Sequence, residues 1–167
     1  SYGKLVSVVR RTPTTMDGDN VDHLITSLTE LFGHEAVQVA EQNSSLQVRG
    51  ENYGRQERAD VVVTIDKARG VDVGFRLNPN TNKFTVVADW YLVGQCKDAL
   101  KEAGIKSSGR QPFVKKVHEG YVHSTTAAAL GRKGFRDVSQ KNQYRDVQQE
   151  NGTTRKARVL KFQRRKL

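Results

Sequence analysis

The chain has 167 residues, a length typical of one globular domain, and 36% of them are hydrophobic. It carries 28 Lys and Arg against 18 Asp and Glu, a formal net charge of +10, and its mean hydropathy is −0.66. The single cysteine, Cys96, excludes an internal disulfide and favours a reducing compartment. No run approaches the roughly 18–20 apolar residues of a membrane helix, so we expect a soluble or peripheral protein with no transmembrane segment.

Strands are predicted from the alternation of apolar and polar residues. We expect them at residues 4–10, 37–40, 46–49, 61–65, 71–77, 84–90, 135–138 and 156–162. A polar turn joins the second to the third. Short loops join the three central strands, and antiparallel pairing is the simplest topology for these three. In the strand 71–77, Asp72, Gly74 and Arg76 define a face open to solvent. The polar segments 50–58 and 141–154 are expected as loops.

Helices are predicted at residues 21–32, 96–103 and 112–130, where apolar residues recur on one face. Asp19 or Asn20 can cap the start of the first helix, and Gly33 can end it. Gly104 closes the second, and Pro112 suits the first position of the third.

These elements predict an α+β fold: a mostly antiparallel sheet of about five strands, two or three helices packed on one face, and a basic C-terminal arm. We expect a single domain over residues 1–163 and a basic tail over residues 164–167.

Charge is distributed unevenly along the chain. Residues 1–104 hold 12 Lys and Arg against 14 Asp and Glu, a net charge of −2, whereas residues 105–167 hold 16 against 4, a net charge of +12. This asymmetry indicates an anionic partner: nucleic acid, an anionic membrane surface or an acidic protein face. A solvated basic tail that only keeps the protein soluble is the alternative.

The segment ADVVVTIDKARGVDVGFRLNPNTNKFTVVADW, from Ala59 to Trp90, resembles the core of the hypothetical chloroplast reading frame thirty-five family, a conserved domain of unknown function of plastids and cyanobacteria. A helix ending around Tyr121 and a glycine turn at Gly152 before a basic last strand are also similar. About two thirds of the chain takes part in the match. The resemblance implies a plastid or cyanobacterial setting and no activity. The start at Ser1 fits an engineered start or a mature form without its targeting peptide, and we favour the second.

Four aspartates at strand ends are the acidic cluster to weigh for chemistry: Asp60, Asp66, Asp72 and Asp89. Strand-borne carboxylates can hold a divalent cation and, with a lysine such as Lys83 or Lys97, cut phosphodiesters. No local motif brings these four together, so turn caps or pairs with basic neighbours such as Arg76 are the better interpretation.

The remaining residue types with reactive side chains show no catalytic pattern either. His118 and His123 are five residues apart, whereas a zinc-binding pair on one helix face is four apart. Cys96 lies on an apolar helix face and is expected as a buried structural thiol. We therefore predict no catalytic residue, no metal site and no cofactor.

Four basic clusters lie in the last third of the chain: Lys115-Lys116, Arg132-Lys133-Arg136, Arg155-Lys156-Arg158 and Lys161-Arg164-Arg165-Lys166. The aromatic residues interleaved with them are Tyr121, Phe135, Tyr144 and Phe162. Such a pattern can bind a phosphate backbone and stack bases, or anchor on an acidic protein surface. The predicted partner-binding residues are Lys115, Lys116, Arg132, Lys133, Arg136, Arg158, Lys161, Arg164, Arg165 and Lys166.

Taken with the resemblance, these features predict a non-catalytic accessory subunit that docks on the stromal side of a plastid thylakoid complex. Photosystem I is the preferred partner, chosen from compartment and charge. The protein is expected in the plastid stroma or on the stromal face of the thylakoid membrane, bound to protein subunits of that complex. An RNA- or ribosome-binding plastid protein is the alternative, and a metal-dependent hydrolase that uses the strand aspartates is a third hypothesis.

Overall fold

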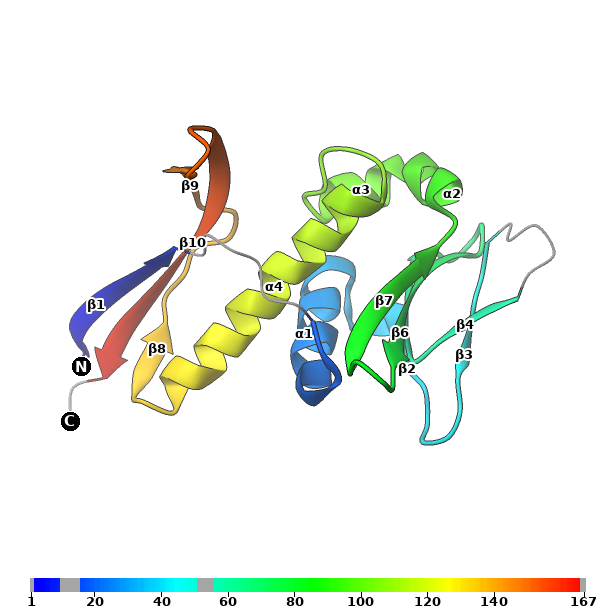
Figure 1. The fold of residues 1–167 in the computed structure, drawn as a ribbon, viewed down its shortest axis with the longest axis horizontal. Coiled ribbons are helices and arrows are strands. Elements are labelled where there is room, and N and C mark those ends of the chain that lie inside the picture. The colour runs from blue at the N-terminus through cyan, green and yellow to red at the C-terminus, as the bar shows by residue number, and fades with distance from the viewer. Residues whose placement is uncertain (1, 10–15, 51–55, 166–167) are drawn as a thin grey trace. The chain divides into compact units, whose positions relative to one another are not determined.

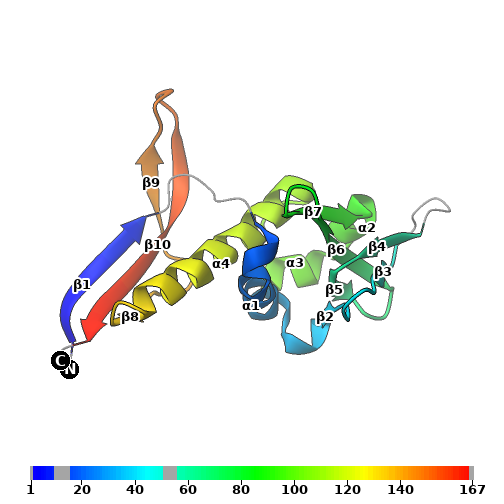
Figure 2. The same cartoon turned by 60° about the horizontal axis from the view of Figure 1, so that its bottom comes forward.

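In the computed structural model (Figures 1 and 2), the described residues are 2–9, 16–50 and 56–165, and for 2–9 only the backbone is described. The chain divides into two compact units, which we call the central unit (Thr15–Tyr121) and the terminal unit (Ser1–Thr14 with Val122–Leu167). The strands pair antiparallel in two four-stranded sheets and one two-stranded sheet. The α+β fold class predicted from the sequence is confirmed.

The main sheet of the central unit has the strand order β2-β5-β6-β7. Its strands are β2 (Val37–Val39), β5 (Val61–Asp66), β6 (Val71–Asn78) and β7 (Lys83–Ala88). The antiparallel pairing predicted for the three central strands is confirmed, with Val63 opposite Val73 and Phe75 opposite Val86. Val63, Val73 and Phe75 are fully buried, so the core of this unit is centred on β5 and β6.

Four α-helices are present among the described residues: α1 (Val21–Phe32), α2 (Trp90–Gln95), α3 (Lys97–Glu102) and α4 (Arg110–Gly131). Two 3₁₀ turns, η1 (Gly18–Asn20) and η2 (His34–Ala36), flank α1. No helix of the described ranges has the length and apolar content that a membrane crossing requires. Helix α4 begins in the central unit and ends in the terminal unit.

The helix ends differ in part from the prediction. Gly33 ends α1 as expected, with a φ of 92°, but neither Asp19 nor Asn20 caps its start through a side chain. The side chain of Asp17 instead accepts a hydrogen bond from the Asp19 amide and starts the 3₁₀ turn before α1. Helix α2 was not predicted, and Trp90, expected in a strand, begins it because Asp89 accepts a hydrogen bond from the Leu92 amide.

A hairpin of β3 (Leu46–Val48) and β4 (Glu57–Ala59) corrects two predictions. β2 pairs with β5, and part of the loop predicted at 50–58 is a strand. The β6 face around Gly74, expected to be open to solvent, is in contact with this hairpin. A Cβ atom on Gly74 would lie 2.4 Å from Cγ2 of Val48, so the hairpin can approach only because that side chain is missing.

The sheet of the terminal unit is built around its longest strand. Its members are β1 (Tyr2–Val9), β8 (Phe135–Asp137), β9 (Tyr144–Gln148) and β10 (Thr154–Arg165), and β10 pairs with the other three. The loop predicted at 141–154 therefore contains β9. β10 also extends beyond the predicted end at Phe162, because Arg164 still pairs with Phe135 of β8. The expected tail 164–167 thus begins inside a strand, and Lys166 and Leu167 lie outside the described residues.

Candidate docking surface

The two faces of the terminal sheet can be read from its strand register. Residues directly opposite each other in an antiparallel pair share a face, and successive residues of a strand alternate between faces. On β10, Phe162 is opposite Asp137 of β8 and Gln163 is opposite Arg136. Further along, Ala157 is opposite Arg145 of β9. The odd-numbered residues of β10 therefore share one face with Arg136 and Arg145, and the even-numbered residues share the other.

Helix α4 packs on the even-numbered side, which we call the helix face. His123 of α4 contacts the carboxylate of Asp137 at 2.5 Å, and Asp137 lies opposite Phe162. Leu160 and Phe162 are buried on this side, with exposed fractions of 1% and 0%. The pKa of Asp137 is lowered, since hydrogen bonds from Ser139 and His123 outweigh the effect of burial.

The opposite side, which we call the cationic face, carries five basic side chains from three strands. They are Arg136 of β8, Arg145 of β9, and Arg155, Lys161 and Arg165 of β10. Arg136, Arg145 and Arg165 are exposed, and the other two are half-buried. Ten residues separate Arg155 from Arg165, a span of about 33 Å along the strand.

No acidic side chain of the described strands lies on the cationic face. The two strand-borne aspartates of this sheet, Asp137 and Asp146, are both on the helix face. Asp146 forms an ion pair of 2.7 Å with Lys156, the residue opposite it. Charges of opposite sign are therefore paired on the helix face, whereas the cationic face carries one sign only.

Small apolar residues lie between the cations on this face. Val147, Ala157 and Val159 are at most 8% exposed. Long Arg and Lys side chains can cover such neighbours with their aliphatic stems while their charged groups stay in water. The cationic face therefore has little accessible apolar surface, and its exposed charged groups are those of Arg136, Arg145 and Arg165.

The aromatic residues that are interleaved with the basic clusters in the sequence gather on one face of the sheet. Phe135 is opposite Arg164, Tyr144 is opposite Arg158, and Phe162 is opposite Asp137, so all three rings lie on the helix face. Among β8, β9 and β10, no aromatic side chain lies on the cationic face, whereas Phe135 and Tyr144 on the helix face lie opposite Arg164 and Arg158. On these three strands, the cations of the cationic face therefore have no neighbouring platform for base stacking, which a single-stranded nucleic acid would need.

The ten predicted docking residues do not form one surface. Arg136, Lys161 and Arg165 lie on the cationic face, while Arg158 and Arg164 lie on the helix face. The other members are in the α4–β8 turn (Arg132, Lys133), in the part of α4 that belongs to the central unit (Lys115, Lys116) and outside the described residues (Lys166). Arg145 and Arg155 were missed. Only the strand register, which includes the unpredicted β9, indicates that they belong to this face.

The four strand-end aspartates each have a separate structural partner. Asp60 accepts a hydrogen bond from the Leu77 amide at 2.7 Å, and Asp66 accepts one from the Arg69 amide at 3.0 Å. Asp89 caps α2, and Asp72 binds Arg49. The interpretation as turn caps and ion pairs is therefore confirmed, although Arg76 pairs with Glu57 instead. Among the described residues, no group of three or more His, Cys, Asp or Glu could hold a metal ion.

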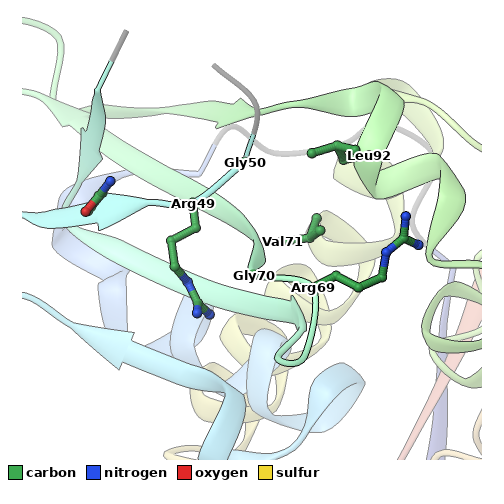
Figure 3. Close-up of a pocket in the computed structure, with 7 residues that line it drawn as sticks. Arg49, Gly50, Arg69, Gly70, Val71 and Leu92 are labelled. Carbon is green, nitrogen blue, oxygen red and sulfur yellow. The ribbon is translucent and has the colours of Figure 1, made fainter. Parts of the chain in front are cut away.

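A pocket of about 480 Å³ in the central unit contains two arginines (Figure 3). It is lined by Gln47, Arg49, Gly50, Arg69, Gly70, Val71 and Leu92. Val71 and Leu92 approach each other across it, while the guanidinium groups of Arg49 and Arg69 point apart. Asp72, only 2% exposed, holds Arg49 through two oxygens at 2.9 and 3.1 Å and raises its pKa, and Arg69 donates to Gln95. These arginines stabilise the fold and do not converge on a ligand.

The remaining reactive side chains have structural surroundings as well. Cys96 is a free thiol of 6% exposure, buried as expected, and burial raises its pKa. The ring of His118 stacks on that of Tyr121, with 5.9 Å between centroids, and His123 binds Asp137. The two histidines therefore take part in separate contacts.

Comparison with known proteins identifies one family. The family model described as protein of unknown function (DUF1257) matches residues 28–155, which is more than half of the chain. The match includes the central sheet, α4, β8 and β9. No curated protein and no solved structure matches the chain.

Proposed function

The chain belongs to the DUF1257 family, whose function is unknown. From the surface of the terminal unit, we propose that the protein is a non-catalytic accessory subunit of a larger complex. It docks through the cationic face on an acidic protein surface of that complex. The terminal unit supplies the contact, and the central unit supplies a folded body. One observation carries this proposal. Five cations from three strands share a face on which no acidic side chain of β8, β9 or β10 lies.

An acidic protein is the preferred partner because of how the side chains are sorted. Exposed arginines are frequent anchors of protein interfaces and can bind carboxylates through two parallel hydrogen bonds. Single-stranded RNA would instead be expected to stack bases on aromatic rings next to the cations. Phe162, the ring at the centre of the sheet, has no exposed surface. RNA or ribosome binding, the second candidate, would have to use phosphate contacts alone on the cationic face.

The cellular setting we propose is the plastid stroma or the stromal face of the thylakoid membrane. It rests on the resemblance of residues 59–90 to a plastid and cyanobacterial family. The terminal unit holds 15 Lys and Arg against 3 Asp and Glu, a net charge of +12. Within that setting, this charge suits a photosynthetic membrane complex with acidic stromal subunits, and photosystem I is the preferred one.

The proposal is tested with the full tagged chain and thylakoid membranes solubilised in mild detergent, analysed by native electrophoresis. We expect the chain to migrate with a pigmented complex. A variant with Arg136→Glu, Arg145→Glu and Arg165→Glu reverses one exposed cation on each of three strands of the cationic face. Its binding should weaken about 100-fold, on the basis of about 1 kcal/mol per contact.

The matched control reverses three cations of the same unit outside the cationic face: Arg132→Glu, Lys133→Glu and Arg164→Glu. This control changes the net charge by the same amount. We therefore expect its binding affinity to fall about tenfold or less, because only the long-range attraction is weakened. Equal losses in the two variants would show that net charge, and not this face, drives binding. Migration with ribosomal RNA, lost steeply as salt is raised, would replace the proposal by the second candidate.

A further inference from the structure

A second pocket of the central unit, with a volume of about 620 Å³, has the composition of a ligand site. It is lined by Gly94, Lys97, Leu100, Lys101, Gly104, Ile105, Lys106, Ser107 and Ser108. The volume lies within the range of about 300–1,000 Å³ that is typical of pockets for small molecules. All of its lining residues belong to α2, α3 and the segment between α3 and α4.

Helix α3 forms one wall of this pocket. Lys97, Leu100 and Lys101 are spaced i, i+3 and i+4, so they lie on one face of the helix. The acidic residues of the same helix, Asp98 and Glu102, lie on a neighbouring face and do not line the pocket. The helix therefore directs two ammonium groups and an apolar side chain toward the pocket, without its own carboxylates.

The chain after α3 forms the rest of the pocket in a defined geometry. Gly104 has a φ of 76°, and the Ile105 amide donates to the Leu100 carbonyl at 2.8 Å, which is the hydrogen bond of a tight helix end. Leu100 and Ile105 are each 6% exposed and provide an apolar floor. Ser108 packs closely on α2, since a Cβ atom on Gly94 would lie 3.3 Å from its Cβ.

Lys97, Lys101 and Lys106 differ from Arg49 of the other pocket, because no carboxylate of the described residues pairs with them. Among the described residues, none of these three lysines forms an ion pair or a hydrogen bond through its side chain. Arg49, in contrast, is bound by the buried carboxylate of Asp72. Three cations around an apolar floor are complementary to a ligand with a negatively charged head and an apolar body.

We propose that this pocket binds a small amphiphilic anion, an apolar chain or ring that carries a phosphate group. The phosphate oxygens accept from the lysine ammonium groups and from the hydroxyls of Ser107 and Ser108, and the apolar part lies on Leu100 and Ile105. A phosphate has enough acceptor oxygens for several of these donors at once, and hydrogen bonds between ionised groups are the stronger ones. The inference is independent of the docking surface, because it uses residues of the central unit only.

The experiment is a titration of the full-length protein with octyl phosphate, in which backbone amide chemical shifts report binding. Inorganic phosphate serves as the probe of the phosphate group alone, and octanol as the probe of the alkyl part alone. We expect saturable shifts at Gly94, Gly104 and Ser108 with octyl phosphate, and affinities at least tenfold weaker for each half. The variant Lys101→Gln with Lys106→Gln should weaken octyl phosphate binding about tenfold, which corresponds to about 1.4 kcal/mol.

A variant with Lys67→Gln and Lys83→Gln is the matched control, because it removes two exposed lysines of the same unit that do not line the pocket. Its affinity should equal that of the unchanged chain, and unchanged amide shifts away from the pocket show that both variants are folded. Octanol binding as tightly as octyl phosphate would overturn the proposal, since the lysines would then play no part. Equal weakening in both variants, or saturable shifts only outside the pocket, would overturn it as well.

Discussion

The central and terminal units use charged residues in opposite ways. The central unit, residues 15–121, has 13 Lys and Arg against 15 Asp and Glu, a net charge of −2. Two of its arginines bind its own carboxylates, in the pairs Arg49–Asp72 and Arg76–Glu57. The terminal unit has a net charge of +12, with three carboxylates in total, and collects five cations on one face of a sheet. In the first unit these ion pairs support the fold, and in the second most of the charge is of one sign.

The central and terminal units also differ in how their sheets are packed. In the central unit the hairpin β3–β4 lies on β6 at Gly74, and Val48, Ala59 and Val62 form a small buried cluster there. In the terminal unit, α4 packs on the helix face and Arg136, Arg145 and Arg165 remain exposed on the other. Stability is therefore expected to be sensitive to substitutions in the central unit, and binding to substitutions in the terminal unit.

The largest effect on stability is expected at Gly74. Gly74→Val places a side chain where a Cβ atom alone would lie 2.4 Å from Val48 and 2.8 Å from Ala59. The hairpin must move away, and we expect a loss of about 3 kcal/mol in the free energy of unfolding, measured by urea denaturation. Gly131→Ala in α4 is the control, because its Cβ would meet nothing within 4 Å, and alanine should stabilise the helix by up to about 1 kcal/mol. Equal stabilities of the two variants would contradict the described packing of the hairpin.

A smaller effect on the free energy of unfolding distinguishes a buried ion pair from an exposed ion pair. Asp72→Asn removes a carboxylate of 2% exposure that binds Arg49 and Thr64, so we expect a loss of about 2 kcal/mol. Asp146→Asn removes the partner of Lys156 in the terminal unit, where both side chains are more than 60% exposed, and should cost less than about 0.5 kcal/mol. Urea unfolding of both variants at neutral pH measures the difference. Similar losses would remove the contrast between the two units.

A further predicted effect on stability depends on pH and concerns Asp137. Its pKa is lowered from 3.8 in the folded chain, so its contribution to stability is complete above that value and is lost as the pH falls through the lowered pKa. We expect a contribution below about 1 kcal/mol, because the side chain is 34% exposed. Unfolding of the unchanged chain and of Asp137→Asn at pH 5.5 and pH 2.5 tests this. The stability difference between the two should shrink at the lower pH, and a constant difference would contradict the assignment.

Several features of the fold were determined by the sequence alone because local interactions specify them. The apolar stripe of α1, its end at Gly33, the long helix α4 and the three central strands were all predicted, since periodicity and a left-handed glycine act within a few residues. The concentration of positive charge after residue 104 is a property of composition and needs no structure.

The features that bear on function were decided by the tertiary structure. Arg136, Arg145 and Arg165 are far apart in the sequence and share a face only because β8 and β9 both pair with β10. The same register moves Phe135, Tyr144 and Phe162 to the opposite face, although they are neighbours of basic residues along the chain. Strand pairing is a non-local interaction, and a shift of one residue would exchange the two faces. The sequence therefore determined that the C-terminal third is cationic, and the register of β10 decided which cations share a face.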